Sequence, residues 1–296
     1  MTVVEEYEDC RRRYMEASWL MHKGEDSYES YKKWREQVPI FQKELSGHVQ
    51  MLLRLQHTGD VEVMNALGDA LQMGFGIKKN REEAIDRFRF AAQAGHTQAM
   101  VRLGRILAHD DLKQLEESCY WFQKAADAGD ASGMVALGFA FREGTGVRTD
   151  YVKAAEWFSK AVDAGDKSAK HLLAKLYYFN MDATDKALPL LLEEAERDNP
   201  DSFKTLARIY GDDLTNQYDF EKAVYWYERI ANGKYEGAAH AARMALAELH
   251  LSGKRQPKNI AKAKEYLEAV VSNSPDKSGY RKDALKVLGK IEKGKA

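Results

Sequence analysis

A short segment recurs four times at nearly constant spacing along this 296-residue chain. It reads GDVEVMNALG from Gly59, GHTQAMVRLG from Gly95, GDASGMVALG from Gly129 and GDKSAKHLLA from Gly165, at spacings of 36, 34 and 36 residues. Internal periods of about 20 to 50 residues are typical of solenoids, whose units are too small to bury their own apolar faces and therefore stack on their neighbours. The period predicts a solenoid.

Each repeat is predicted to be a pair of helices. The first block ends in leucine followed by a small residue, and the second block, such as VKAAEWFSKAVDAG from Val152, carries apolar residues three and four apart. That spacing forms one face of an amphipathic helix. Glycine-containing turns such as EGTGVRTD from Glu143 join the two blocks. The small residues Gly68, Gly104 and Gly138 are expected to let the two helices of a hairpin lie close together.

The unit that begins at Gly129 resembles the Sel1-like repeat, a relative of the tetratricopeptide repeat. It departs from the usual pattern at Gly133, where alanine is usual, and at Phe141, where tyrosine is usual. The resemblance extends over about residues 59 to 293 and implies an all-α, right-handed solenoid of about six stacked hairpins with helical caps. The positions that match are Leu137, Gly138, Gly144, Gly146, Val147, Asp150, Lys153, Ala154, Trp157, Lys160, Ala161 and Gly165.

Other copies are less regular, and the two ends of the chain carry no complete copy. The unit from Gly95 lacks the glycine turn, and the unit around Leu173 lacks the tryptophan. Before the first copy we expect three helices, at Val3–His22, at Ser27–Gln37 and from Phe41 onward. The predicted domains are a diverged helical cap over 1–58, the repeat solenoid over 59–282 and a capping helix over 283–296.

The charge balance and the cysteine content restrict the classes of partner and the cellular compartment that we expect. The chain has 45 basic and 46 acidic side chains, a balance that leaves no strong field for nucleic acid or an anionic membrane. Cys10 and Cys119 are too few for a disulfide framework, which favours a reducing compartment. Glu5 and Glu6 interrupt the apolar core that a signal peptide needs, and no run reaches the roughly 18 apolar residues of a membrane span. We expect a cytoplasmic protein that binds neither nucleic acid nor membrane.

No motif predicts catalysis, a cofactor or a metal ion. The glycine turns at Gly74 and Gly144 lack the spacing of a phosphate-binding loop. The eight histidines form no HExxH pattern, and Cys119 has no identifiable base. The sequence therefore predicts a protein that is not an enzyme.

One helix face stands out in the first helix of each unit. Positions two before, two after and five after the key leucine lie opposite the packing side and should line the inner, concave surface of a curved stack. The central position is acidic in the end units, at Asp69 and Glu248. Between them, basic and aromatic residues suit the anchoring of an acidic or extended protein segment, although an ordinary solvated face with stray aromatics is the alternative. The candidate partner-binding residues are Arg105, Phe139, Arg142, His171, Lys175, Tyr178, Lys204 and Arg208.

The resemblance implies a protein-binding scaffold or adaptor without catalysis of its own, since similar proteins are implicated as adaptors in signalling, secretion and assembly. A sharper alternative is an immunity protein that neutralises a bacterial toxin or secretion effector, as some resembling proteins do. An alternative from another class is a hydrolase acting on cell wall or β-lactams. Those resemblances rest on cysteine-rich repeats, from which this two-cysteine chain departs.

Overall fold

The computed structural model describes residues 2–22, 28–109, 114–233, 236–253, 255–275 and 278–294. Over these residues the chain forms fifteen α-helices, one short 3₁₀ helix and no β-strand. Consecutive helices pack as hairpin pairs, so the prediction of an all-α solenoid of stacked hairpins is confirmed. The chain divides into two compact units, Met1–Ala169 (unit 1) and Lys170–Ala296 (unit 2).

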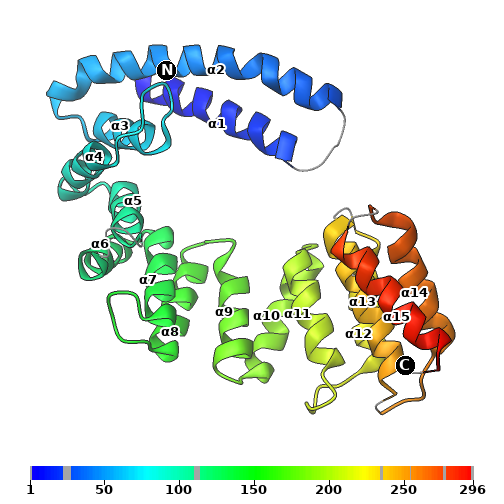
Figure 1. Cartoon of the computed structure of the whole chain (residues 1–296). Coiled ribbons are helices and arrows are strands. Elements are labelled where there is room, and N and C mark those ends of the chain that lie inside the picture. The colour runs from blue at the N-terminus through cyan, green and yellow to red at the C-terminus, as the bar shows by residue number, and fades with distance from the viewer. Residues whose placement is uncertain are drawn as a thin grey trace. The chain divides into compact units, whose positions relative to one another are not determined.

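Unit 1 begins with an antiparallel pair of long helices and continues with three hairpins (Figure 1). The first helices of successive hairpins are also neighbours, since α1 contacts α3 and α5 contacts α7. Their bounds are α1 (Val3–His22), α2 (Tyr28–Leu55), the 3₁₀ helix η1 (Gln56–Thr58), α3 (Val61–Met73), α4 (Arg81–Gln93), α5 (Thr97–Leu107), α6 (Leu115–Asp127), α7 (Ala131–Glu143) and α8 (Tyr151–Asp163).

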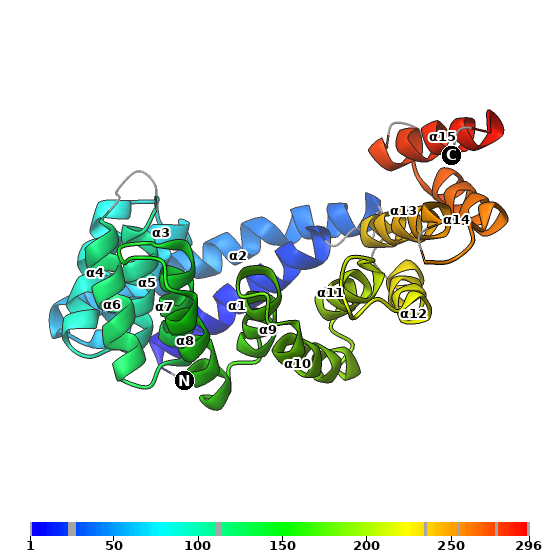
Figure 2. The same ribbon diagram turned by 90° about the horizontal axis from the view of Figure 1, so that it is seen from below.

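Unit 2 contains three further hairpins and a final single helix, which lies beside α14 at the C-terminal end (Figure 2). The described residues thus hold the six hairpins that the repeats predict. The bounds are α9 (Ala169–Asn180), whose first residue is the last of unit 1, α10 (Thr184–Glu196), α11 (Pro200–Gly211), α12 (Phe220–Ala231), α13 (Glu236–Ser252), α14 (Ile260–Asn273) and α15 (Gly279–Glu292).

Local sequence accounts for the sharp ends of the helices. The carboxylate of Asp130 accepts a hydrogen bond from the backbone N–H of Gly133 at 2.9 Å, which caps the start of α7. Gly144 ends the same helix with a φ of 75°, a left-handed conformation that glycine adopts without strain. Asp150 then caps α8 through the N–H of Lys153 at 3.0 Å. Stop and start signals a few residues apart produce the tight hairpin of α7 and α8.

The N-terminal region differs from the expectation in one respect. The helix expected at Val3–His22 is α1, but the two helices expected at Ser27–Gln37 and from Phe41 are one continuous helix, α2. Ser27 itself lies outside the described residues. Pro39 stands inside α2 without ending it, because side chains after the proline, such as Leu45, are buried in a core shared with α1 and α3. Burial of that face outweighs the local cost of the proline.

The C-terminal helix α15 begins at Gly279, before the expected start at Asp283. The domain boundaries at 58/59 and 282/283 stay predictions. Among the described helices, none combines the length and apolar character that a membrane span requires.

Candidate interaction surface

Close contacts between glycine and phenylalanine set the rotation of the first helices in unit 1. A Cβ added at Gly104 would lie 2.5 Å from the ring of Phe122, and one added at Gly138 would lie 2.6 Å from the ring of Phe158. The glycine side of each first helix is therefore pressed onto the second helix. The side opposite the buried leucines Leu103 and Leu137, here called the first-helix face, carries the candidate residues.

In unit 1 the three candidate residues occupy two separate places. Arg105 is exposed on α5 and lines a groove of about 580 Å³. Phe139 and Arg142 are half-buried on α7 and contact each other, with the guanidinium carbon of Arg142 4.6 Å from the centre of the Phe139 ring. Phe139 also meets Phe158 edge-on at 5.4 Å between ring centres. These two side chains are engaged in packing, whereas Arg105 faces open space.

The N-terminal helix covers the first-helix face at α3. Asp69, which occupies the same repeat position as Arg105, is only 5% exposed. The hydroxyl of Tyr7 donates a hydrogen bond to its carboxylate at 3.2 Å, while Arg11 lies 3.4 Å and Arg102 3.6 Å from that carboxylate. Burial raises the pKa of Tyr7 above its ordinary value, and the charge of Asp69 adds to the effect. No repeat pattern in the sequence could have located Tyr7 or Arg11 at this position.

In unit 2 the candidate residues lie on α9 and α11. The guanidinium carbon of Arg208 lies 5.5 Å from the ring centre of Phe179, and the ring centres of Tyr178 and Phe179 are 4.7 Å apart. Burial raises the pKa of Tyr178, and the nearby Arg208 charge opposes that shift. These contacts bring Arg208 and Tyr178 together.

The other three candidates of unit 2 have different surroundings. The ring nitrogen Nδ1 of His171 lies 3.2 Å from the hydroxyl of Ser202, and burial lowers the pKa of His171. Lys175 is half-buried on α9, and Lys204 is exposed on α11. Lys204 is therefore the more accessible of the two lysines.

A pocket of about 370 Å³ beside Arg208 is more acidic than the basic helix face suggests. Arg208 shares its lining with Asp212, Asp213 and Glu248. The two aspartates follow α11 in the connection to α12, a segment without helical periodicity, so their position could not be read from the repeat. The pocket beside Arg208 therefore presents both positive and negative side chains to a ligand.

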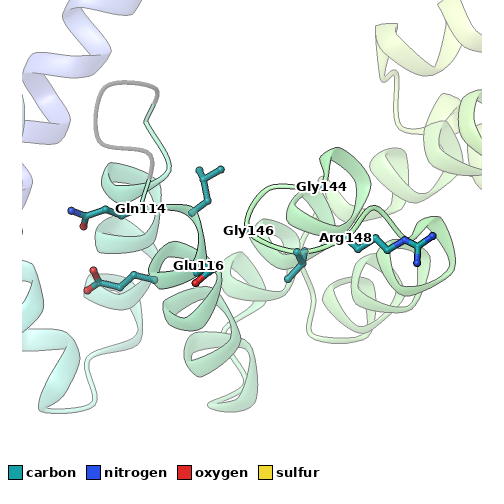
Figure 3. A pocket seen from close by; sticks show the side chains of 8 residues that line it. Gln114, Glu116, Gly144, Gly146 and Arg148 are labelled. Carbon is teal, nitrogen blue, oxygen red and sulfur yellow. The ribbon is translucent and has the colours of Figure 1, made fainter.

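Another pocket, of about 690 Å³, lies between the start of α6 and the turn that joins α7 to α8. Figure 3 shows Gly144 and Gly146 in that turn, with Gln114 and Glu116 on the side of α6. A side chain at Gly146 would collide with the backbone of Leu115, so the glycine is needed for close packing of neighbouring repeats. Within the described ranges, no group of three or more His, Cys, Asp or Glu residues is placed to hold a metal ion.

Comparison with known proteins agrees with the observed architecture. The sequence pattern of the Sel1 repeat matches residues 61–96, 97–130, 131–166, 206–235 and 240–269, more than half of the chain. The unmatched stretch before residue 206 contains α9 and α10, which form a hairpin although the repeat has diverged there. Tertiary packing thus preserves a unit that the sequence pattern no longer reveals.

Two solved structures share the fold. The protective antigen c5321 of uropathogenic Escherichia coli, which displays an SLR fold, superposes with a TM-score of 0.62 at 19% identity, covering 89% of this chain. The match spans 59% of the antigen's own length. A Sel1 repeat protein from Oxalobacter formigenes gives a TM-score of 0.57 at 23% identity and covers 82% of this chain and 96% of that one.

Repeats of the Sel1 and tetratricopeptide type generally mediate protein–protein interaction, and the Sel1 family typically serves as a non-catalytic interaction scaffold. The five matched repeats, together with consecutive hairpins in both units, assign the fold and its ancestry. This chain belongs to the Sel1 repeat family.

Proposed function

We propose that this protein is a non-catalytic scaffold or adaptor that binds a protein partner on its first-helix faces. The observation that carries the proposal is the exposure of Arg105, Lys204 and Arg208 on first helices. In unit 1 the opposite side of these helices is held in the core by buried leucines such as Leu103 and Leu137. Rigid helices that present exposed side chains within each unit are suited to recognition rather than to chemistry.

The chemistry around Arg208 favours an acidic or extended segment as the bound element. Its guanidinium lies beside Phe179, whose side chain is 48% exposed, and close to Tyr178. Arginine and aromatic residues are enriched among the residues that dominate binding energy at protein interfaces. Asp212 and Glu248 in the neighbouring pocket add acceptors for a basic group of the same partner. We place this function in the cytoplasm.

Affinity capture with the full chain as bait tests the proposal. The variant with Arg105→Glu, Lys175→Glu and Arg208→Glu is expected to lose a partner that the unaltered chain retains, because like charges would then face the acidic segment. The control carries the same number of reversals at exposed sites away from the candidate residues, Arg148→Glu, Lys282→Glu and Lys286→Glu, and should retain the partner. Equal recovery with both variants would contradict binding through the first-helix faces.

The two alternative functions, an immunity protein and a hydrolase, stay predictions, and each has its own assay. Neutralisation of a toxin would appear as a captured effector whose activity falls when this chain is added. Hydrolase activity would appear as turnover of a chromogenic β-lactam.

A further inference from the structure

The charged side chains are unevenly distributed along the chain, although their totals nearly balance. Residues 251–296 carry 12 basic and 5 acidic side chains, whereas residues 1–250 carry 33 basic and 41 acidic side chains. The last part of unit 2 is therefore strongly basic within a chain that is otherwise weakly acidic. Because salt at about 0.1 M screens charges beyond about 10 Å, this local excess decides what binds there, rather than the net charge of the whole chain.

Helix α15 presents much of this positive charge on one face. Successive residues of an α-helix turn by about 100°, so four of its lysines fall within a sector of about 80°. The two acidic residues of the helix, Asp283 and Glu292, lie outside this sector, one on either side. All four lysines are exposed, and over the described part of the chain none of them forms an ion pair. This lysine face consists of Lys282, Lys286, Lys290 and Lys293.

Packing on the opposite side of α15 fixes the direction of the lysine face. Ala284 and Ile291 are buried in a cluster shared with α13 and α14. The guanidinium of Arg281 donates hydrogen bonds to the backbone carbonyls of Val271 and Ser274 at the end of α14. Helix α15 is the outermost helix of unit 2 (Figure 2). The lysines are consequently directed away from the core of their unit.

The lysine face is open and includes an apolar side chain at its edge. A Cβ added at Gly289, which lies between the lysines, would meet no described atom within 4 Å. Leu285 is 50% exposed and takes no part in the buried cluster that holds Ala284. None of the three pockets described above is lined by a residue of α15. The face thus places a leucine beside four ammonium groups on an open helix surface.

We propose that the lysine face of α15 docks onto the anionic lipid surface of a membrane. The ammonium groups pair with phosphate and carboxylate groups of the lipids, and Leu285 enters the boundary between headgroups and acyl chains. The long stems of the lysines let their charges stay at headgroup level while the helix approaches the surface. The expectation that the chain binds no membrane rests on its net charge, whereas this contact depends on local charge. The inference does not depend on the proposed scaffold function.

A lipid surface fits this face better than the other anionic partners do. The lysine face has no aromatic ring on which a base could stack and no arginine for bidentate contacts with base edges. A peptide segment is bound most readily in a recess that covers it, whereas α15 offers an open helix surface. A bilayer supplies both the anionic groups that the lysines match and an apolar layer for Leu285.

Sedimentation of the full chain with sucrose-loaded vesicles tests the proposal. We expect binding to phosphatidylcholine vesicles that contain about one third phosphatidylserine in about 0.1 M salt, and none to phosphatidylcholine alone. Each lysine near an anionic surface strengthens binding about fivefold, so Lys286→Gln combined with Lys290→Gln should lower the partition coefficient about 25-fold. Leu285→Ser, which leaves the charge unchanged, should lower it about fivefold.

The control combines Lys78→Gln with Lys167→Gln, which removes the same charge at two exposed lysines of unit 1 and should leave the partition coefficient unchanged. The proposal is overturned by a failure to sediment with anionic vesicles, by an equal loss in the control, or by an unchanged coefficient in Leu285→Ser. Tighter binding to a DNA duplex or to polyglutamate than to the vesicles would overturn it as well. Partner capture without lipid judges the scaffold function separately, because its charge-reversal control already includes Lys282→Glu and Lys286→Glu.

Discussion

At the scale of single residues, one contact between the two helices of a hairpin depends on the sizes of the residues that meet there. Where the first helix carries glycine, as at Gly104, the second presents a phenylalanine, Phe122. In unit 2 the equivalent first-helix position is Ala174, and the matching residue of α10 is the smaller Leu191 in the same core. In the hairpin of α9 and α10 the added methyl of the first helix accompanies a smaller side chain on the second, which keeps the packing dense there.

Gly104→Ala should destabilise unit 1 although alanine is the better helix former. The added Cβ would lie 2.5 Å from the ring of Phe122, and overpacking of this kind costs about 1–3 kcal/mol. That cost exceeds the gain of about 1 kcal/mol in helix propensity. The free energy of unfolding, measured by guanidinium denaturation, should fall.

Two further variants separate the effect of the Phe122 contact on stability from the effect of helix propensity. Gly47 lies in α2 with no described atom within 4 Å of an added Cβ, so Gly47→Ala should stabilise by up to about 1 kcal/mol. Adding Phe122→Leu to Gly104→Ala recreates the combination of Ala174 and Leu191 and should recover part of the loss. If the double variant is no more stable than Gly104→Ala, the sizes of residues 104 and 122 are not coupled in this hairpin.

A buried histidine gives unit 2 a dependence on pH. His250 is 8% exposed, stacks on Tyr266 with ring centres 5.9 Å apart and meets Phe220 edge-on at 5.1 Å. Burial lowers its pKa, Lys262 lowers it further, and Glu228 and Glu265 oppose the shift. Its Nε2 has no hydrogen-bond partner among the described residues.

We therefore expect unit 2 to lose stability as the pH falls below about 6.5, the usual pKa of histidine. The unfolded chain then takes up a proton that folded His250 resists, so protons favour unfolding. His250→Phe should weaken this loss, with part remaining because burial also lowers the pKa of His171. Denaturation between pH 7 and pH 5 measures the effect. His57 is exposed, so the control His57→Gln should leave the pH dependence of the unfolding free energy unchanged. If His250→Phe also leaves it unchanged, His250 is not the cause of the loss of stability.

At the scale of elements, tertiary burial overrides local signals in the longest helix. Helix α2 continues through Pro39, whose side chain is exposed. A proline in a helix interior removes one backbone hydrogen bond and clashes with the preceding turn. Leu45 and Leu52 of the same helix are buried against α1 and α3, which compensates for this cost. The pattern of local breakers alone therefore predicts two helices where one exists.

Pro39→Ala should stabilise unit 1 by about 1–3 kcal/mol, because it restores the missing donor in an exposed helix interior. The change would be read from the free energy of unfolding and from helicity by circular dichroism. Pro200→Ala is the control, since Pro200 opens α11, where proline is tolerated, and should change stability little. A loss of stability in Pro39→Ala would mean that the proline fits α2 without cost.

At the scale of the whole molecule, the chain consists of two units, each with its own buried clusters. The cluster around Phe88 and Leu103 belongs to unit 1, and the cluster around Leu191 and Leu206 belongs to unit 2. In a stack of repeats, stability is close to a sum of single units and contacts between neighbours. A destabilising substitution in one unit should therefore lower the stability of that unit and leave the other little changed.

Asp69→Ala tests this locality. It leaves Arg11, Arg102 and the hydroxyl of Tyr7 without their shared acceptor, and removing one partner of a buried ion pair costs about 3–5 kcal/mol. Hydrogen exchange measured by mass spectrometry should show faster exchange in α1, α3 and α5 and little change in α11–α14. Replacement of the exposed Asp163 by alanine is the control. Equal acceleration throughout the chain would contradict independent units.

The hairpins, their caps and their order along the chain could be predicted from the sequence because they follow from local properties. The period of the repeats, the spacing of apolar residues and stop signals such as Gly144 and Asp150 each act within a few residues. The neighbourhood of Arg208 and Tyr178 was not predicted, since they occupy different positions of their repeats, two residues after Leu206 and five after Leu173.

Contacts outside the repeat period required the folded structure. Tyr7 and Asp69 are 62 residues apart, and no pattern relates a cap helix to a repeat, so the burial of Asp69 by α1 has no signal in the sequence. The acidic residues Asp212 and Asp213 lie in a connection without periodicity. Long-range packing also made α2 continuous through Pro39. Near-neighbour chemistry specifies which helices form, whereas the burial free energy of the assembled units specifies which of their faces remain open to a partner.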